Sequence, residues 1–495
     1  MIPYKTIIQF DRNSKQALYL QLANQFIILI KDKKLLPSTK LPGSRTLASL
    51  LEVHRKTVVA CYDELLAQGW VESISKKGTF VHADLPELYQ KEKQVLDDEF
   101  KSNSAGFQFY TDKKLERKSP KLQEGFMSLN DGVSDVRLTP IIDLARIYRR
   151  ISGRKLIYKE MSYGSLFGNE KLRKTLSEYL NKTRGLNTTI SNILITRGSQ
   201  MGIHLSAKLL LQKEDVIIVG ETNYTSADTS FLQQEAKLLR VPVDENGLVI
   251  SKIETICKEQ QIKAVYVTSH HHHPTTVTLS AERRIHLLNL SKTYNFAIIE
   301  DDYDYDFNYQ YSPILPLASH DTNGNVIYIG SVCKTVAPVF RVGYLIASKE
   351  FVNEAANQRR FIDRQGDALL ELTFEEFIKN GDLDRHIKKV MKIYKQRRDL
   401  FCKLLIDNFS DVFQFEIPKG GMAVWVKLNK KYSWKKVTEI AKINKLNIGD
   451  WQRYDNAKIG HNSIRIGFAA YDEKEIYELM NRLFKTMKEI RNDNF

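Results

Sequence analysis

The sequence predicts an α/β fold in its large C-terminal part, preceded by a small helical unit. Short β-branched apolar runs alternate with helical segments in residues 126–495. Near the N-terminus, apolar residues recur at helical spacing and are followed by two short β-rich runs. Residues 83–125 are dense in both charge signs and poor in aliphatic side chains, which predicts a linker. We therefore expect units at 1–82 and 126–495, joined by this linker.

The composition of the chain excludes several classes of protein. The chain has 495 residues, 42% of them hydrophobic, which is enough to build cores and excludes wholesale disorder. The four cysteines lie far apart, with no metal-ligand spacing and no disulfide framework, so a reducing cytoplasm is expected. The first residues contain no apolar signal-peptide region, and the apolar runs are strand-sized, so no membrane span is expected.

The N-terminal unit begins with an amphipathic helix. Its apolar face is formed by four residues at helical spacing, Leu18, Leu22, Phe26 and Leu29. After a Pro- and Gly-containing break, a short helix is expected over 44–51 with Ser44 as its N-cap. A turn at 52–54 leads to a second short helix that should end at Gly69, a suitable C′ residue.

Two β-rich runs, 70–73 and 78–82, flank the turn Lys76-Lys77-Gly78 and predict a hairpin. Helix, helix, tight turn, helix and basic hairpin is the winged helix-turn-helix order, in which a short helix enters the major groove and the wing touches phosphates. Residues 1–82 hold 12 Lys and Arg against 6 Asp and Glu, within a chain of net charge +15. A polyanionic partner is therefore expected, and a solvated basic face without a partner is the alternative.

Residues 18–81 also contain specific short sequence motifs, in addition to this order of elements. The LPGSRTLA turn at 41–48, the helix with Thr57-Val58, Tyr62 and Gly69, and the GTFV strand at 78–81 closely resemble the DNA-binding domain of the GntR family. The resemblance implies double-stranded DNA as a partner. It also implies six DNA-contact residues, which are Arg45, Arg55, Lys56, Thr57, Lys77 and Gly78.

In the large unit, five near-continuous apolar runs indicate buried strands of a parallel or mostly parallel sheet. They are 216–220, 264–269, 296–302, 326–331 and 341–348. Because ligands of such sheets bind at the carboxyl ends of the strands, the polar residues that follow these runs are the candidates for a site.

Those polar residues form a chemically coherent set. Ser199 and Gln200 open a helix, whose first N–H groups favour a phosphate. Asp301 and Tyr303 stand at the end of one strand, and three further residues follow the next strand, which are Ser331, Lys334 and Arg341. A Schiff-base lysine, a carboxylate for a pyridinium nitrogen, and Arg and Ser for a phosphate are what pyridoxal 5'-phosphate (PLP) requires.

Several longer motifs carry a second resemblance. EDDYD at 300–304, the stretch 330–344 around Lys334, ITRGSQ at 195–200 and the stretch 163–186 are similar to the fold-type-I aminotransferases. The whole chain resembles the MocR/GabR subfamily of GntR regulators, in which a winged helix is joined by a linker to an aminotransferase-like domain. The resemblance implies a PLP-binding domain with a mostly parallel sheet and a smaller C-terminal α+β lobe.

The same resemblance assigns roles to residues of the large unit. Lys334 is implied as the Schiff-base lysine, Asp301 as the partner of the pyridine nitrogen and Tyr303 as a donor to the phenolic oxygen. The implied phosphate ligands are Ser199, Gln200, Ser331 and Arg341. Tyr163 is implied to reach the phosphate of a neighbouring subunit, and Tyr224 to stack on the ring. Arg465, in SIRIGFA, is implied to bind the α-carboxylate of an amino-acid ligand.

Four adjacent histidines occupy 270–273. A metal site is disfavoured because consecutive residues cannot all face one ion and no cysteine or carboxylate cluster accompanies them. The resemblance places His271 on the family's own histidine, which implies a position near the PLP pocket, and puts His273 where relatives have phenylalanine. No metal is expected.

The two resemblances together imply a function. We expect a DNA-binding, PLP-binding transcription regulator that senses PLP or an amino compound through an internal aldimine at Lys334. A working aminotransferase that carries a DNA-binding head is the alternative, and a domain that only dimerises the winged helix is a third hypothesis. The resemblance also implies a head-to-tail homodimer on promoter repeats in the bacterial cytoplasm.

Overall fold

The computed structural model describes residues 2–85, 105, 107–112, 124–310, 314–332, 334–455 and 457–492. The chain divides into two compact units, Met1–Thr111 and Asp112–Phe495. Most of the expected linker at 83–125 lies outside the described residues. In the described parts of the chain, no helix is long and apolar enough to cross a membrane.

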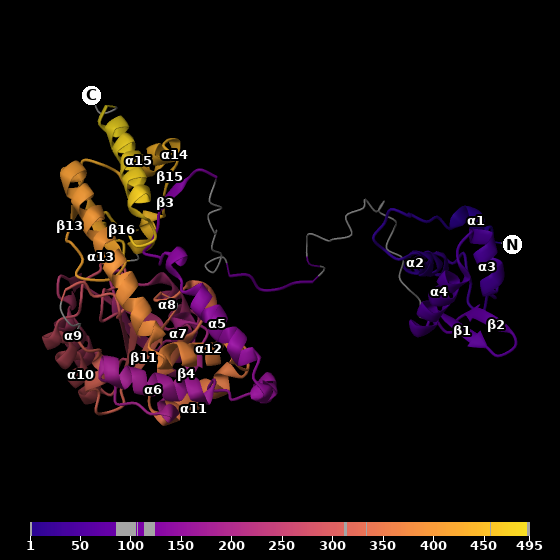
Figure 1. Cartoon of the computed structure of the whole chain (residues 1–495), viewed down its shortest axis with the longest axis horizontal. Helices are drawn as coiled ribbons and strands as arrows, with labels where there is room; N and C mark the ends of the chain where they lie inside the picture. Colours follow the sequence, from indigo (N-terminus) through magenta and orange to yellow (C-terminus); the bar gives the residue numbers. More distant parts are fainter. Residues whose placement is uncertain are drawn as a thin grey trace. The chain divides into compact units, whose positions relative to one another are not determined.

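The N-terminal unit has the winged helix-turn-helix order that the sequence predicts (Figure 1). Its elements are α1 (Tyr4–Ile7), α2 (Leu18–Lys31), α3 (Ser44–Leu51), α4 (Arg55–Ala67), β1 (Val71–Ile74) and β2 (Gly78–Val81). β1 and β2 pair antiparallel, with Val71 opposite Val81, and form the wing. Leu22, Phe26 and Leu65 are fully buried at its centre, so this unit has a core of its own.

The C-terminal end of α4 agrees with the prediction, and the N-terminal end of α3 differs from it. Gly69 follows the C-cap of α4 with φ 76°, a left-handed conformation that favours glycine, as predicted. The prediction of Ser44 as an N-cap is wrong. Gly43 is the N-cap of α3: its backbone is extended, and its carbonyl accepts the Leu47 N–H at 2.9 Å. Ser44 is therefore already the first helical residue.

We expect Phe26→Ala to destabilise the N-terminal unit by about 3–5 kcal/mol, because it leaves a cavity in a closed core. The Phe26 ring is fully buried between Tyr4 and Tyr62, at centroid distances of 5.9 and 6.1 Å. Scanning calorimetry of the full chain should show this unit melting at a lower temperature. Ile28→Ala on the same helix is the matched control, because Ile28 is 51% exposed. Equal effects of the two changes would contradict the assigned core.

The large unit is built on a mixed, mostly parallel seven-stranded sheet, as predicted. Its strands, in spatial order, are β4 (Ile193–Thr196), β12 (Gly343–Ile346), β11 (Val326–Ser331), β10 (Ala297–Asp302), β9 (Ala264–Val267), β5 (Val216–Gly220) and β6 (Lys237–Val241). β12 runs antiparallel to both of its neighbours, and the other pairs are parallel. The carboxyl ends of β4, β11, β10, β9 and β5 therefore lie at the same end of the sheet.

Helices cover both faces of this sheet. Leu194 of β4 packs in the cluster that contains α7 (Ser199–Leu210), α8 (Thr225–Leu232) and α11 (Lys349–Arg359). Ile193 and Ile195 point to the opposite face and pack with helices α5 (Ile141–Ser152), α6 (Glu170–Arg184) and α12 (Ala368–Lys379). α9 (Ile250–Glu259) and α10 (Ala281–Tyr294) cover the rest of that face. Burial on both faces explains why these strands read as continuous apolar runs.

A smaller α+β lobe completes the unit, as predicted, and Figure 1 shows α13 running from the large lobe into it. Its strands are β13 (Phe413–Phe415), β14 (Ala423–Leu428) and β16 (Ser463–Gly467) in one antiparallel sheet, and β3 (Met127–Leu129) beside β15 (Leu446–Ile448). Its helices are α13 (Asp382–Phe409), α14 (Trp434–Ile443) and α15 (Glu473–Asn492). β3 precedes the large lobe in sequence, so the chain enters this unit through the small lobe.

Candidate functional site

The N-terminus of α7 lies at the carboxyl end of β4, where the sequence placed a phosphate site. Gly198, the N-cap of α7, has φ 78°, and a Cβ built on it would lie 2.8 Å from Nη2 of Arg341. Arg341 donates from Nη2 to the carbonyl oxygen of Arg197 at 2.7 Å. A guanidinium thus lies next to the start of a helix, at a residue whose left-handed backbone conformation favours glycine.

Ser331 is the last residue of β11, which is separated from β4 by β12, and it lies at the same end of the sheet. It stands opposite Gly343, on which a Cβ would come within 2.8 Å of Gly198. Its hydroxyl donates to the carbonyl oxygen of Val342 at 3.2 Å. The structure therefore brings Ser199, Gln200, Ser331 and Arg341 to one end of the sheet.

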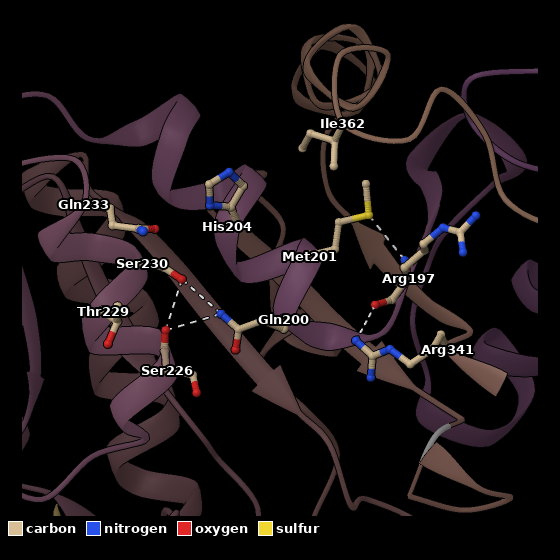
Figure 2. A pocket seen from close by; sticks show the side chains of 10 residues that line it. All are labelled: Arg197, Gln200, Met201, His204, Ser226, Thr229, Ser230, Gln233, Arg341 and Ile362. Carbon is tan, nitrogen blue, oxygen red and sulfur yellow. Dashed lines mark hydrogen bonds between the residues drawn. The ribbon is translucent and has the colours of Figure 1, made fainter. Parts of the chain in front are cut away.

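A pocket of about 490 Å³ opens beside this helix end (Figure 2). Gln200 projects towards α8, and its Nε2 donates to Ser230 Oγ at 3.0 Å and to the Ser226 carbonyl at 3.3 Å. The other amide atom, Gln200 Oε1, is buried and has no hydrogen-bond partner among the described residues. Arg341 lines the same pocket, so the wall of the pocket carries a cation.

Asp301 occupies the end of β10 and is only 2% exposed. Its Oδ2 accepts a hydrogen bond from the Tyr266 hydroxyl at 2.8 Å, whereas its Oδ1 is buried with no partner among the described residues. Burial raises the pKa of Asp301 to about 7, although the Tyr266 hydrogen bond and the nearby Lys334 cation act in the opposite direction. A buried carboxylate with an unused oxygen is a site for a further donor.

Lys334 lies in the segment that follows β11, close enough to Asp301 and His273 for its charge to lower the pKa of each. Its Nζ donates to the carbonyl oxygen of Gly132 at 3.0 Å. The amine is therefore held between the end of the sheet and the segment that follows β3.

Arg465 extends from β16 of the small lobe and is 2% exposed. Its Nη2 donates to the Tyr303 hydroxyl at 3.3 Å, and its Nη1 donates to the Pro274 carbonyl at 3.1 Å. Tyr303 in turn donates to the carbonyl oxygen of His271 at 2.8 Å. Arg465 and Tyr303 are thus brought together, Arg465 from a strand of the small lobe and Tyr303 from the residue that follows β10 in the large lobe.

Asp131 is a member of this site that sequence reasoning missed. Its Oδ1 lies 3.6 Å from Arg465 Nε and accepts the Tyr454 hydroxyl at 2.7 Å. Its Oδ2 lies 3.1 Å from Arg453 Nη2 and 3.2 Å from His273 Nε2. Burial alone would raise the pKa of Asp131, but His273 and the guanidinium groups of Arg465 and Arg453 hold it well below its usual range. An Asn-Asp-Gly sequence is typical of a turn, so composition gave no indication of this role.

The four histidines have four different partners. The pairs are His270 with Asp302, His271 with Asp304, His272 with Thr275 and His273 with Asp131. Burial lowers the pKa of His272 to about 3. Throughout the described ranges, no group of three or more His, Cys, Asp or Glu residues could hold a metal ion.

Three of the expected cofactor residues have different surroundings. The ring of Tyr224 lies edge-on to that of His273, 5.3 Å between centroids, so His273 is a second residue at this site that was not predicted. The ring of His271 faces Asp304 and the Gly420 backbone. Tyr163 lies apart, 77% exposed, against the guanidinium of Arg364 at 4.4 Å. The cofactor roles of Tyr163, Tyr224 and His271 remain predictions.

In the N-terminal unit, the expected DNA contacts lie at the starts of α3 and α4 and on the wing. Arg45, Arg55, Lys56, Lys77 and Gly78 are exposed, and Thr57 is half-buried. A groove of about 350 Å³ runs along α4 and is lined by Arg55, Lys56, Val59, Ala60 and Asp63. Val59 and Ala60 were missed, although their spacing of four residues from Arg55 and Lys56 puts them on the same helix face.

Comparisons with known proteins match both units. Residues 140–483 match the class I and II aminotransferases, and residues 18–81 match the bacterial regulatory proteins of the gntR family. The chain is 24% identical to the probable rhizopine catabolism regulatory protein MocR of Rhizobium meliloti, over 96% of this chain and 95% of that protein. It is 26% identical to the HTH-type transcriptional regulator NorG of Staphylococcus aureus, over 91% of this chain and the whole of the relative.

Solved aminotransferases match the large unit. The kynurenine aminotransferase of Pyrococcus horikoshii is 27% identical and aligns with a TM-score of 0.71, over 77% of this chain and 97% of that chain. The family match covers more than half of the chain, and the gntR-family match identifies a DNA-binding domain. The chain therefore belongs to the class I and II aminotransferase family and, with its N-terminal gntR-family domain, is a MocR-type GntR transcription regulator.

Proposed function

We propose that this regulator binds PLP at Lys334 and senses an amino compound at the same site, and that the ligand changes its binding to DNA. The observation that carries the proposal is the buried, unpartnered Oδ1 of Asp301, within electrostatic reach of Lys334. The structural relatives support it, because the Pyrococcus kynurenine aminotransferase was crystallised in complex with PMP, with kynurenine as its substrate.

The residues present fit PLP. A protonated pyridine nitrogen would supply the donor that Asp301 Oδ1 lacks, and its charge would favour the ionised carboxylate. Arg341 and the first N–H groups of α7 suit a phosphate, because a planar guanidinium binds phosphate oxygens in pairs. When bound, PLP supplies an aldehyde that amines attack and an electron-poor ring. The chain's own residues would orient it between Tyr224, Asp301 and Lys334.

An amino-acid effector would use the remaining groups. Arg465 would bind its carboxylate, and Lys334 would hold the reacting amine position. Because Arg465 belongs to the small lobe and Lys334 to the large lobe, a ligand that contacts both would favour one arrangement of the lobes. We extend the proposal to a head-to-tail homodimer on promoter repeats in the bacterial cytoplasm, with the exposed Tyr163 available to a second subunit.

Lys334→Ala tests the proposal. PLP-loaded wild type should show a visible absorbance band that depends on Lys334, and amino acids should change both this band and the affinity for promoter DNA, followed by fluorescence anisotropy. Lys334→Ala should lose both responses, while Lys349→Ala, an exposed lysine at the start of α11, should keep them.

Each other outcome selects another hypothesis. A PLP-treated wild type without the band would refute the cofactor part of the proposal. Sustained turnover of an amino donor with a keto acceptor would favour the working aminotransferase instead. DNA affinity that is unchanged by every amino ligand and by PLP would leave the large unit a dimerisation domain.

A further inference from the structure

A short turn, residues 130–132, contacts both groups that the proposed function assigns to the amino ligand. The carbonyl oxygen of Gly132 accepts Lys334 Nζ at 3.0 Å. The carbonyl oxygen of Asp131 accepts Arg465 Nε at 3.4 Å, and the Asp131 carboxylate lies 3.6 Å from the same nitrogen. The turn therefore supplies an acceptor to the amine and an anion to the guanidinium, and the second of these is the contact that the carboxylate of an amino acid would make there.

The surroundings of the Asp131 carboxylate are those of a binding site for a carboxylate ligand. Arg465, Arg453, His273 and Tyr454 all turn donors towards it, at 2.7–3.6 Å. Two guanidinium groups face this single carboxylate, so the cluster favours an anion at this position. About a third of the Asp131 side chain is exposed, so a solute could exchange with it.

The turn is fitted closely to the small lobe. The Asn130 carbonyl accepts the Gly467 N–H at 2.7 Å, and Asn130 Oδ1 accepts the Gly132 N–H at 2.9 Å. Gly132 has φ 78°, and a Cβ on it would lie 3.1 Å from Ala423 Cβ. These contacts fix where Asp131 is presented, so its position under Arg465 follows from the backbone of the turn.

The turn also continues directly from β3 (Met127–Leu129), which pairs with β15. β3 is the first strand of the large unit in the sequence. Asp131 is therefore only two residues beyond the end of β3.

We propose that Asp131 determines specificity as an internal carboxylate that occupies the Arg465 site, so that an amino-acid effector must displace it. The inference rests on the proposed function only in assigning Arg465 to the effector's carboxylate. A ligand with a carboxylate competes with Asp131 and loosens the 130–132 turn next to β3. An amine without a carboxylate leaves Asp131 in place and does not act on the turn. The site thereby selects amino acids over amines for its response, at the cost of a weaker affinity for carboxylates.

Asp131→Asn tests this inference, with L-phenylalanine and 2-phenylethylamine as probes that differ only in the carboxylate. In PLP-loaded protein, the variant should bind phenylalanine about tenfold more tightly than wild type does, because a charged competitor is removed, and phenylethylamine with unchanged affinity. In PLP-free protein, calorimetry should show the same gain for 3-phenylpropionate. Asp411→Asn is the matched control, because Asp411 forms an ion pair with Arg491 on the surface at 2.7 Å.

An unchanged ratio of the phenylalanine and phenylethylamine dissociation constants, or a weaker affinity of the variant for 3-phenylpropionate, would overturn the inference. Hydrogen exchange of the wild type provides a measurement that needs no variant: exchange at residues 127–133 should rise with 3-phenylpropionate and not with phenylethylamine. Unchanged or slower exchange there would also overturn it. Because the 3-phenylpropionate measurements use PLP-free protein, they remain decisive when PLP fails to bind and the proposed function is refuted.

Discussion

Asp301→Asn should stabilise the PLP-free protein against unfolding at neutral pH and leave its stability unchanged in acid. Burial raises the pKa of Asp301 from 3.8 to about 7, so the folded protein holds a proton that the unfolded chain releases near pH 4. Below that pH the side chain is protonated in both the folded and the unfolded state, so its ionisation contributes nothing to the free energy of unfolding. As pH rises from about 4 to about 7, wild type loses stability, by at most about 4 kcal/mol for a shift of this size. Asparagine does not ionise and avoids this loss.

Urea unfolding of both proteins between pH 4 and pH 8 measures this difference. The gap in unfolding free energy between variant and wild type should open across the window and stay constant above it. Asp411→Asn, on the surface, should show no such trend. Curves for Asp301→Asn and wild type that stay parallel across the window would contradict the prediction.

With PLP bound, the order should reverse. A pyridinium donor at Oδ1 would stabilise the ionised carboxylate, and asparagine would leave that donor without a charged partner. We expect Asp301→Asn to retain PLP about 10- to 100-fold less tightly, measured by equilibrium dialysis. A group that destabilises the free protein and tightens the cofactor complex is what a cofactor site requires and what a purely structural carboxylate would not show.

The strands of the sheet could be predicted where both of their faces are buried, because such strands are apolar at nearly every position. The run 216–220 is β5 to the residue, because both faces of that strand are covered and each position is apolar. β6 (Lys237–Val241) was missed because it lies at the edge of the sheet, where only its last residue is buried and Lys and Arg are tolerated. The antiparallel direction of β12 could not be predicted from composition, because the direction of a strand depends on how the chain connects it to the other strands.

The site was predictable where it follows strand ends and not where it depends on the other lobe. Asp301 and Lys334 lie near each other because the carboxyl ends of parallel strands lie at the same end of a sheet. This rule can be applied to the sequence alone. Asp131 and Arg465 are 334 residues apart and meet only because β3 and β16 fold into the same lobe. Likewise, the histidine loop has no regular period, so sequence could not tell that His273, rather than His271, would contact Asp131.

Arg55→Ala should weaken binding to operator DNA by about 10- to 100-fold, corresponding to about 1–3 kcal/mol. Arg55 is the first residue of α4, exposed, and its Nε approaches Ser44 Oγ, the first residue of α3, at 3.5 Å. It therefore lies where the N-terminal ends of both helices present positive charge, which favours phosphate or base-edge acceptors.

Fluorescence anisotropy, on a DNA fragment that the wild type selects from a random pool, measures this loss at several salt concentrations. A phosphate contact would reduce the salt slope by about one and weaken all sequences alike, whereas a base contact would relax preference at one position. Lys33→Ala is the matched control, an exposed lysine in the turn after α2. If both variants lose the same affinity, the loss reflects net charge, and α4 is not the helix that reads DNA. If only Arg55→Ala loses it, the groove along α4 is the reading surface, and Val59, exposed on the same face, is the next residue to replace.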